Sequence, residues 1–340
     1  MHFLITGHTG FKGTWMSFLL ARKGHEVSGY ALDPIPGSLY ADTTIKNRLS
    51  HDYRADIRDR DTLGRAFAEI KPDVVIHMAA QPLVLESYKN PRETFESNVN
   101  GTLNILEATS NTPSVKAQVI ITTDKVYKNK RQRAGYVETD ELGGEDPYSA
   151  SKAMADILTQ SWIKSFPGVP TAIARAGNVI GGGDVSKDRL IPDLIKSYLE
   201  KKPALLRNPQ AVRPWQHVLD CLAGYLKLTD YLLDGGADSL WNFGPTSEEF
   251  MEVSKVADLV GKDWGVEPAW KHDSMTYPKE AHLLALDSSK VRQNLGWREI
   301  YDFEKSVLQT SEWYKLVHSG VNKEEATTND VENFLLRLTS

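Results

Sequence analysis

The sequence has 340 residues, of which 41% are hydrophobic and 25% are charged, enough for one large domain or two closely joined ones. A net charge of −5 gives no reason to expect a nucleic-acid or anionic-membrane partner, and no apolar run approaches the roughly 20 residues of a membrane helix. Cys221 is the only cysteine, which excludes an intrachain disulfide and a thiolate metal cluster and suits a cytoplasmic location. No group of His, Asp and Glu residues has the spacing of a metal site, so no metal is expected.

The first half of the chain alternates between two periodicities. Apolar, strand-like runs cover residues 2–6, 26–32, 73–79, 117–123 and 170–176, and helical patterns between them cover 12–23, 61–70, 91–110 and 148–166. This alternation predicts a Rossmann-type fold of the α/β class, a doubly wound parallel sheet covered on both faces. Ligands of such sheets bind beyond the carboxyl ends of the strands. The first run begins at once, so we expect no signal peptide.

The pattern changes near residue 177. Helices are expected at 189–201, 215–233, 247–261, 288–295 and 302–318, with short strands between them and a last helix near the end. We therefore predict a domain of residues 1–176 and a smaller C-terminal α/β lobe of residues 177–340, with some segments crossing between the two. The lobe is expected to close over the ligand.

A glycine-rich loop follows the first strand. Gly7, Gly10 and Gly13 permit a tight turn, close approach of a pyrophosphate and close packing of helix on strand, and the helix N-terminus favours phosphate. Asp33 ends the second strand, 20 residues after Gly13, where an acid binds the ribose hydroxyls and repels a 2′-phosphate. NAD is therefore the expected cofactor. The alternative interpretation is that Asp33 starts a turn before Pro34.

Tyr148 and Lys152 stand four residues apart at the start of a predicted helix, on one face. A nearby ammonium lowers the pKa of a phenol, so Tyr148 is a candidate proton shuttle for the oxidation of an alcohol. Just after the fourth strand, Asp124 and Lys125 place an acid beside a base. They form either a catalytic pair or a structural ion pair.

With these motifs, the chain resembles the extended short-chain dehydrogenases/reductases that act on nucleotide sugars, and among them most the CDP-glucose 4,6-dehydratases. The resemblance spans nearly the whole chain and is carried by GHTGFKGTW (7–15), AAQPLV (79–84), TTDK (122–125), DPYSASK (146–152), RAGNVIGGGD (175–184), DRLIPD (188–193), RNPQAVRPWQHVLD (207–220), WNFGP (241–245) and EAHLLALDSSK (280–290).

The resemblance implies a hydro-lyase that converts CDP-glucose into a 4-keto-6-deoxy sugar, with NAD regenerated in each turnover. Tyr148 would take the proton of the 4-hydroxyl while hydride passes from C4 to NAD. Lys125 would take the C5 proton and Asp124 would protonate the departing 6-hydroxyl, after which the hydride returns to C6. Thr123 would hydrogen-bond the 4-oxygen. Residues 1–176 would bind NAD, and residues 177–340 the nucleotide sugar.

The resemblance also implies two sets of binding residues. The set expected at the cofactor is Gly7, Thr9, Gly10, Phe11, Lys12, Gly13, Asp33, Asp56, Ile57, Ala79, Ala80, Gln81, Asn98 and Thr122, with Tyr148 and Lys152. The set expected at the substrate is Ser87, Asn178, Arg189, Leu190, Arg207, Arg213, Asn242, Glu280 and His282. Two positions depart from the relatives: Leu85 stands where an arginine is usual, and Val185 where an aromatic residue is common.

Other functions stay open. A nucleotide-sugar 4-epimerase, or a 4,6-dehydratase for another nucleotide sugar, would share most of these motifs. An epimerase needs no acid–base pair at C5 and C6, so Asp124 and Lys125 argue against it. A non-catalytic NAD-binding protein is disfavoured by the intact Tyr148 and Lys152. In the relatives, the helices that match 91–110 and 148–166 build a dimer interface, which implies a homodimer, with a tetramer as the alternative.

Overall fold

The structure is a computed structural model that describes the chain except residues 131, 133, 276–282, 284 and 339–340. Seven parallel strands form the central sheet in the spatial order β11-β6-β5-β4-β1-β2-β3. They are β1 His2–Thr6, β2 Glu26–Ala31, β3 His51–Arg54, β4 Val74–His77, β5 Ala117–Thr123, β6 Thr171–Ala176 and β11 Leu240–Phe243. The predicted Rossmann-type parallel sheet is confirmed.

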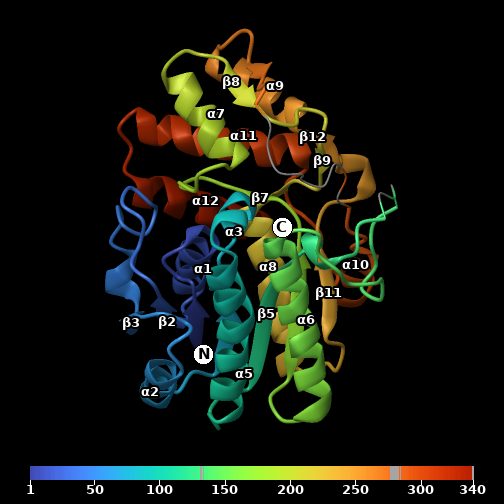
Figure 1. Cartoon of the computed structure of the whole chain (residues 1–340). Coiled ribbons are helices and arrows are strands. Elements are labelled where there is room, and N and C mark those ends of the chain that lie inside the picture. Colours follow the sequence, from blue (N-terminus) through green and yellow to red (C-terminus); the bar gives the residue numbers. More distant parts are fainter. Residues whose placement is uncertain (131, 133, 276–282, 284, 339–340) are drawn as a thin grey trace.

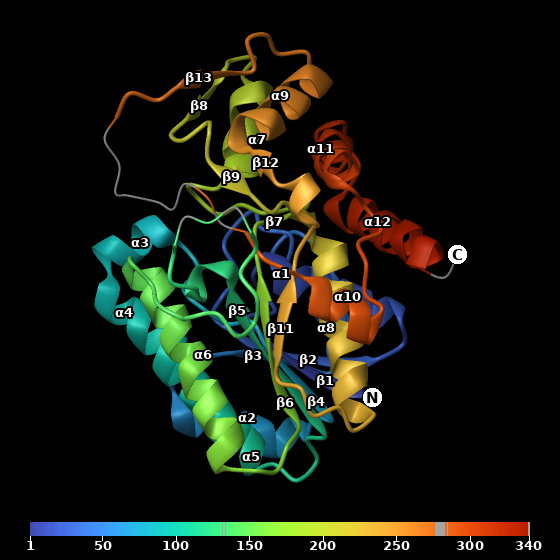
Figure 2. The same ribbon diagram turned by 90° about the vertical axis from the view of Figure 1, so that its right-hand side faces the viewer.

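Helices cover both faces of this sheet, as Figure 2 shows in an edge-on view. One face carries α1 Phe11–Arg22 and α8 Val218–Leu233; the other carries α2 Arg60–Ile70, α5 Gly101–Ser110 and α6 Pro147–Ser165. The helix predicted at 91–110 is confirmed as one continuous helix, in which the π-helical segment Glu96–Asn100 joins α4 Pro91–Phe95 to α5. A further short helix, α3 Val84–Lys89, was not predicted.

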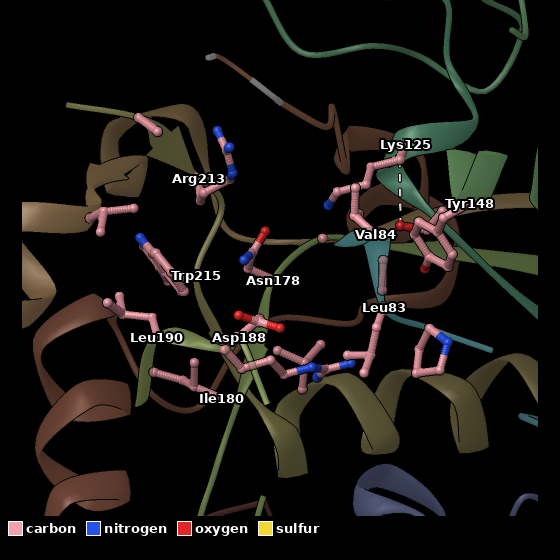
Figure 3. A pocket seen from close by; sticks show the side chains of 18 of the residues that line it. Leu83, Val84, Lys125, Tyr148, Asn178, Ile180, Asp188, Leu190, Arg213 and Trp215 are labelled. Atoms are coloured by element: carbon pink, nitrogen blue, oxygen red, sulfur yellow. Dashed lines mark hydrogen bonds between the residues drawn. The ribbon is translucent and has the colours of Figure 1, made fainter. Parts of the chain in front are cut away.

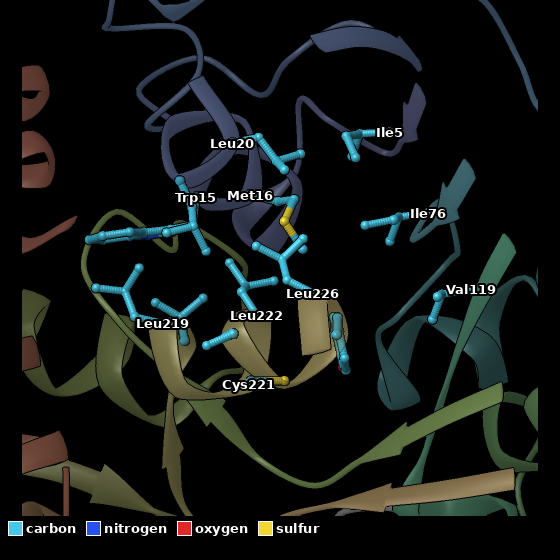
Figure 4. Packing of buried hydrophobic residues seen from close by; sticks show 14 of the residues in the cluster. Ile5, Trp15, Met16, Leu20, Ile76, Val119, Leu219, Cys221, Leu222 and Leu226 are labelled. Atoms are coloured by element: carbon cyan, nitrogen blue, oxygen red, sulfur yellow. The ribbon is translucent and has the colours of Figure 1, made fainter. Parts of the chain in front are cut away.

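Alternating strand residues separate two apolar cores, since neighbouring side chains on a strand point to opposite faces. Ile5, Ile76 and Val119 pack against α1 and α8 in a cluster that includes Trp15 and Leu222 (Figure 4). The preceding or following residues of the same strands, Leu4, Val75 and Ile120, join the cluster under α2 and α5. Burial on both faces explains why these strands are apolar without polar alternation.

A smaller lobe lies beyond the carboxyl ends of the strands, at the top of Figure 1. Its helices are α7 Leu190–Leu199, α9 Val253–Trp264 and α11 Phe303–His318. Two further helices lie lower: α12 Lys323–Leu338 packs on α1, and α10 Ser289–Leu295 packs beside β11. The described residues also form three two-stranded pairs: β7 Val179–Ile180 with β10 Gln216–His217, β8 Ala204–Leu206 with β13 Trp270–His272, and β9 Val212–Arg213 with β12 Met251–Glu252. Leu194, Tyr198, Trp215 and Val260 belong to the separate core of this lobe.

The chain returns to the main sheet after it first leaves it at residue 176. Helix α8 packs on β5 and β6, and β11 adds a seventh strand beside β6. The second half of the sequence therefore supplies part of the first core. None of the helices among the described residues is long and apolar enough to cross a membrane.

Candidate active site

A cavity of about 1070 Å³ lies between the carboxyl ends of the strands and the smaller lobe. Its wall combines the end of β5, the start of α6, the segment after β6, the start of α7 and the loop after β8. Figure 3 shows Tyr148 and Lys125 on one side of this cavity and Leu190, Arg213 and Trp215 on the other. The strand-end rule used on the sequence thus locates the cavity correctly.

The glycine loop joins β1 to α1 in a conformation that other residues would disrupt. Gly7 has φ +75°, and a Cβ on Gly13 would lie 2.1 Å from the carbonyl oxygen of Gly7. Because no side chain caps α1, the backbone N–H groups of its first turn remain available to an anion. Lys12, in that turn, lines the cavity. The loop has the features that a dinucleotide pyrophosphate requires.

The other residues expected at the cofactor are arranged around this loop. Asp33 is exposed just beyond the end of β2. The hydroxyl of Thr9 in the glycine loop donates to the carbonyl of Leu32, the residue before Asp33, at 3.0 Å. Phe11 is partly buried beside Gly181. Asp56 forms an ion pair with Arg58 at 2.6 Å. The hydrogen bonds from Arg58 lower the pKa of the Asp56 carboxyl.

The segment after β4, residues 79–81, packs next to the glycine loop. Ala79 contacts Gly7 so closely that a Cβ on the glycine would lie 2.8 Å from the Ala79 nitrogen, and Ala80 lines the cavity. Asn98 is buried; it accepts from the Gln81 N–H at 2.8 Å and donates to the Ser151 hydroxyl at 2.9 Å. Ile57 is also buried, and it packs in the core under α2.

Tyr148 stands in the first turn of α6 because Asp146 caps this helix by accepting from the Ser149 N–H at 2.9 Å. Burial raises the pKa of Tyr148 to about 12, although a hydrogen bond with the Thr123 side chain and the charge of Arg189 act in the opposite direction. This differs from the expectation that Lys152 lowers the pKa of Tyr148. The ammonium of Lys152 donates to the carbonyl of Ile121 at 2.7 Å instead.

Lys152 is itself strongly perturbed. Its side chain is buried, and desolvation, helped by the charge of Lys12, lowers the pKa of its ammonium to about 7. Both Tyr148 and Lys152 line the cavity together with Thr122 and Thr123. Buried titratable groups with strongly shifted pKa values are typical of catalytic sites.

The acid and the base at the end of β5 are joined through one carboxylate oxygen. Oδ1 of Asp124 accepts from the Thr123 hydroxyl at 2.8 Å and from the Lys125 ammonium at 3.4 Å. Oδ2 is buried and has no hydrogen-bond partner within the described chain. Asp124 is 1% exposed, whereas the Lys125 side chain is 23% exposed and lines the cavity. The pair is therefore accessible from the cavity on the lysine side.

A buried hydrogen-bond network, which was not predicted from the sequence, fixes the end of β5 on the side away from the cavity. Arg175 forms a two-point ion pair with Asp156, and both side chains are fully buried. Asp156 also accepts from Thr122 at 3.1 Å, while Arg175 donates to the Tyr127 hydroxyl at 2.8 Å. Tyr127 in turn donates to Asn242 on β11 at 2.7 Å. A buried arginine inside the apolar pattern of β6 was the available signal.

The residues expected at the substrate divide into three groups. Five of them line the cavity: Asn178, Arg189, Leu190, Arg207 and Arg213. Two others are buried away from it. The Ser87 hydroxyl accepts from the Tyr148 N–H at 3.1 Å, and Asn242 is fully buried in the network behind β5. Glu280 and His282 lie outside the described residues. Of the two positions expected to depart from the relatives, Leu85 lines the cavity and Val185 is exposed.

Comparisons with known proteins agree with this geometry. The model of the NAD dependent epimerase/dehydratase family matches residues 3–244. The chain is 41% identical to a CDP-glucose 4,6-dehydratase of Salmonella typhimurium over 97% of this chain and 95% of that protein. It is 30% identical to a dTDP-glucose 4,6-dehydratase of Shigella flexneri over 98% and 95% of the two chains.

Solved structures show the same fold. A dTDP-glucose 4,6-dehydratase of Bacillus anthracis in complex with NAD has a TM-score of 0.81 at 22% identity, covering 94% of this chain and 98% of its own. A UDP-glucose-4-epimerase of Stenotrophomonas maltophila with bound NAD has a TM-score of 0.83 at 21% identity, covering 94% and 99%. From the family match and the 41% identical relative, the chain belongs to the NAD dependent epimerase/dehydratase family.

Proposed function

We propose that this protein is a hydro-lyase that converts CDP-glucose into CDP-4-keto-6-deoxyglucose. The observation that carries the proposal is that Lys125 and Tyr148 line one cavity and that the buried Asp124 is paired with Lys125 behind its wall. An acid and a base are required where a proton leaves C5 and a hydroxyl leaves C6. The 41% identical relative, a CDP-glucose 4,6-dehydratase, supports the same reaction and the same nucleotide.

NAD is the cofactor of this family, and the residues present fit it. Gly7 and Gly13 leave room at the helix N-terminus for a pyrophosphate, and the exposed Asp33 is available to ribose hydroxyls. When bound, NAD supplies a hydride acceptor for C4 and a hydride donor for C6. We propose that residues 1–176 provide this site and that residues 177–340 bind the nucleotide sugar.

Tyr148 receives the proton of the 4-hydroxyl in the first step of the proposed mechanism. Its burial disfavours the phenolate, so the groups that stabilise this form are essential. Thr123 offers a hydrogen bond and Arg189 a positive charge, and both lower the pKa of Tyr148. Lys152, with a pKa near 7, is able to exchange a proton near neutral pH.

Lys125 and Asp124 carry out the elimination. A 4-keto group acidifies the C5 proton; neutral Lys125 takes that proton, and protonated Asp124 gives one to the departing 6-hydroxyl, so one water leaves. The step ends with an ammonium and a carboxylate, which is the ordinary charge state of such a pair. When C6 has received the hydride, the Lys125 ammonium returns a proton to C5, and the proton that Tyr148 took from the 4-hydroxyl passes through solvent to restore the ion pair. Before the next turnover, transfer of one proton across the 3.4 Å between Nζ and Oδ1 makes both groups neutral again. A bound substrate favours this transfer because desolvation disfavours both charges.

Mass spectrometry tests the proposal directly. The purified protein with NAD is incubated separately with CDP-glucose and with dTDP-, UDP- and GDP-hexoses, and the loss of one water is sought in each product. Loss from CDP-glucose is the expected result. Loss from another donor alone would keep the chemistry and overturn the nucleotide, whereas no loss from any donor would favour an epimerase.

A matched pair of variants then tests the base. Lys125→Met is expected to abolish water loss, while Lys128→Met, an exposed neighbour paired with Glu141, is expected to leave it intact. Dehydration by Lys125→Met at the wild-type rate would contradict the role of this lysine.

We also propose that the protein is a cytoplasmic homodimer that associates through α4, α5 and α6. On α6, Met154 and Ile157 are 48% and 53% exposed and stand one helical turn apart, as an apolar contact surface requires. Sedimentation equilibrium of the wild type and of Ile157→Lys tests this assembly. The variant is expected to dissociate, and a monomeric wild type would refute the proposal.

A further inference from the structure

The lining of the cavity extends beyond the parts that a hexose and a diphosphate would occupy, and the additional lining residues belong to the smaller lobe. Tyr148 and Lys125 fix one side of the cavity as the place of the hexose (Figure 3). The cationic side chains of Arg189 and Arg213 also line the cavity and suit a diphosphate. The part formed by α7, β8 and the residues after β8 is left for the nucleoside. This inference rests on the proposed function.

The carboxylate of Asp193 lies in this part of the cavity wall. Asp193 lies in the first turn of α7, and Leu190, Asp193 and Leu194 are spaced so that they share one face of the helix. All three line the cavity, as do Leu205 and Leu206 of β8, which packs against α7. The leucine side chains beside Asp193 form an apolar surface that suits a flat ring, and the charged side chains of Asp188 and Arg207 line the same cavity nearby.

The Asp193 carboxylate is paired with no other side chain among the described residues. Within the described part of the chain it makes no hydrogen bond or ion pair, and its side chain is exposed at the cavity. Partial desolvation, together with the nearby charge of Asp188, raises the pKa of Asp193 to about 6, while Arg207 and Lys196 oppose this effect. A carboxylate in this position would repel a phosphate, so it requires a ligand group that donates hydrogen bonds.

We propose that Asp193 accepts a hydrogen bond from the exocyclic amine of cytosine and thereby selects CDP-sugars over UDP- and dTDP-sugars. At position 4 cytosine carries an amine donor, whereas uracil and thymine carry a carbonyl acceptor. A carboxylate opposite that carbonyl meets no donor and is left unpaired beside a negative dipole. Unpaired polar groups of this kind discriminate between ligands more strongly than apolar contacts do.

The test is a measurement of nucleotide affinity. Dissociation constants of CDP, UDP and 2′-deoxy-CDP are measured by calorimetry for the NAD-loaded wild type and for three variants. Asp193→Asn offers both a donor and an acceptor, Asp193→Glu keeps the carboxylate, and Glu200→Gln removes one charge from the exposed end of the same helix without touching the cavity.

The wild type is expected to bind CDP about tenfold or more tightly than UDP, the value of one hydrogen bond to a charged group. In Asp193→Asn the ratio of the two dissociation constants is expected to fall close to one, chiefly because UDP binds better. Asp193→Glu is expected to retain a preference for CDP, and Glu200→Gln is expected to keep the full wild-type ratio.

Three results would overturn the inference. An unchanged ratio in Asp193→Asn would show that this acid does not read the base, while the preference of the wild type for CDP would leave the proposed function intact. Equal weakening of CDP and UDP with lost discrimination against 2′-deoxy-CDP would assign Asp193 to the ribose. A wild type without preference for CDP would overturn both this inference and the nucleotide in the proposed function.

Discussion

Replacement of Lys152 by methionine is expected to stabilise the cofactor-free protein while it removes a group from the active site. The folded-state pKa of Lys152 is about 7, against an ordinary value of 10.5. Between these two values the unfolded chain binds more protons than the folded one, so this lysine makes stability rise with pH across that window. The free-energy cost of burying Lys152 is greatest at pH values below its folded-state pKa and vanishes at pH values above its ordinary pKa.

The magnitude follows from the same pKa values. At about pH 8, keeping the lysine neutral in the folded state costs about 3 kcal/mol relative to the unfolded chain. Loss of the hydrogen bond to the Ile121 carbonyl removes about 1 kcal/mol, so Lys152→Met gains about 2 kcal/mol in free energy of unfolding. For a chain of this length, that gain corresponds to a rise of about 3 °C in Tm.

Thermal unfolding without NAD at several pH values is the assay, because bound NAD would itself stabilise the folded state. The rise in Tm is expected near pH 8 and should disappear near about pH 10, where the deprotonation cost is about 1 kcal/mol and only offsets the lost hydrogen bond. Lys196→Met, which alters an exposed lysine on α7, serves as the control and should leave Tm nearly unchanged. A fall in Tm at pH 8, or a rise that is independent of pH, would refute the reasoning.

Three further changes test other parts of the site. Tyr148→Phe is expected to lower kcat by about 100- to 10,000-fold with NAD affinity unchanged; a small loss in a steady-state assay would contradict its role as proton shuttle. Asp33→Ser is expected to raise affinity for NADP relative to NAD by about tenfold, as measured by cofactor titration, and an unchanged ratio would leave the acid without a role at the ribose. Arg175→Met leaves the Asp156 carboxylate buried and unpaired, so urea unfolding is expected to show a loss of about 3–5 kcal/mol; a loss below about 1 kcal/mol would mean that water reaches this network.

The sequence predicted best what depends on local pattern. The strands 2–6 and 117–123 begin and end where the apolar runs do, because each run is bounded by polar or glycine-rich residues. The loop at Gly7 to Gly13 was predictable because its backbone geometry excludes other residues. Asp124 and Lys125 are neighbours in the sequence, so their proximity was certain before the structure was known.

Contacts between distant segments escaped prediction. Nothing local indicates that Asn242 hydrogen-bonds Tyr127 behind the sheet rather than facing the cavity, because the pairing of β11 with β6 decides it. The pKa of Tyr148 depends on burial by the whole site, which spacing from Lys152 does not reveal. No role for Asp193 was predicted from the sequence, because its place in the cavity wall depends on the packing of α7 against β8.

The short pair β7–β10 has a consequence for how specificity is able to diverge. The chain leaves the sheet region through β7 and comes back through β10, and these two strands lie side by side, paired at Val179–Gln216 and Ile180–His217. Residues 181–215 are therefore an excursion whose two ends are held together, and they carry Asp193, Arg207 and Arg213. A graft of this excursion between relatives would exchange the proposed nucleotide-binding wall as a unit, while the sheet, the glycine loop and the Asp124–Lys125 pair stay as they are.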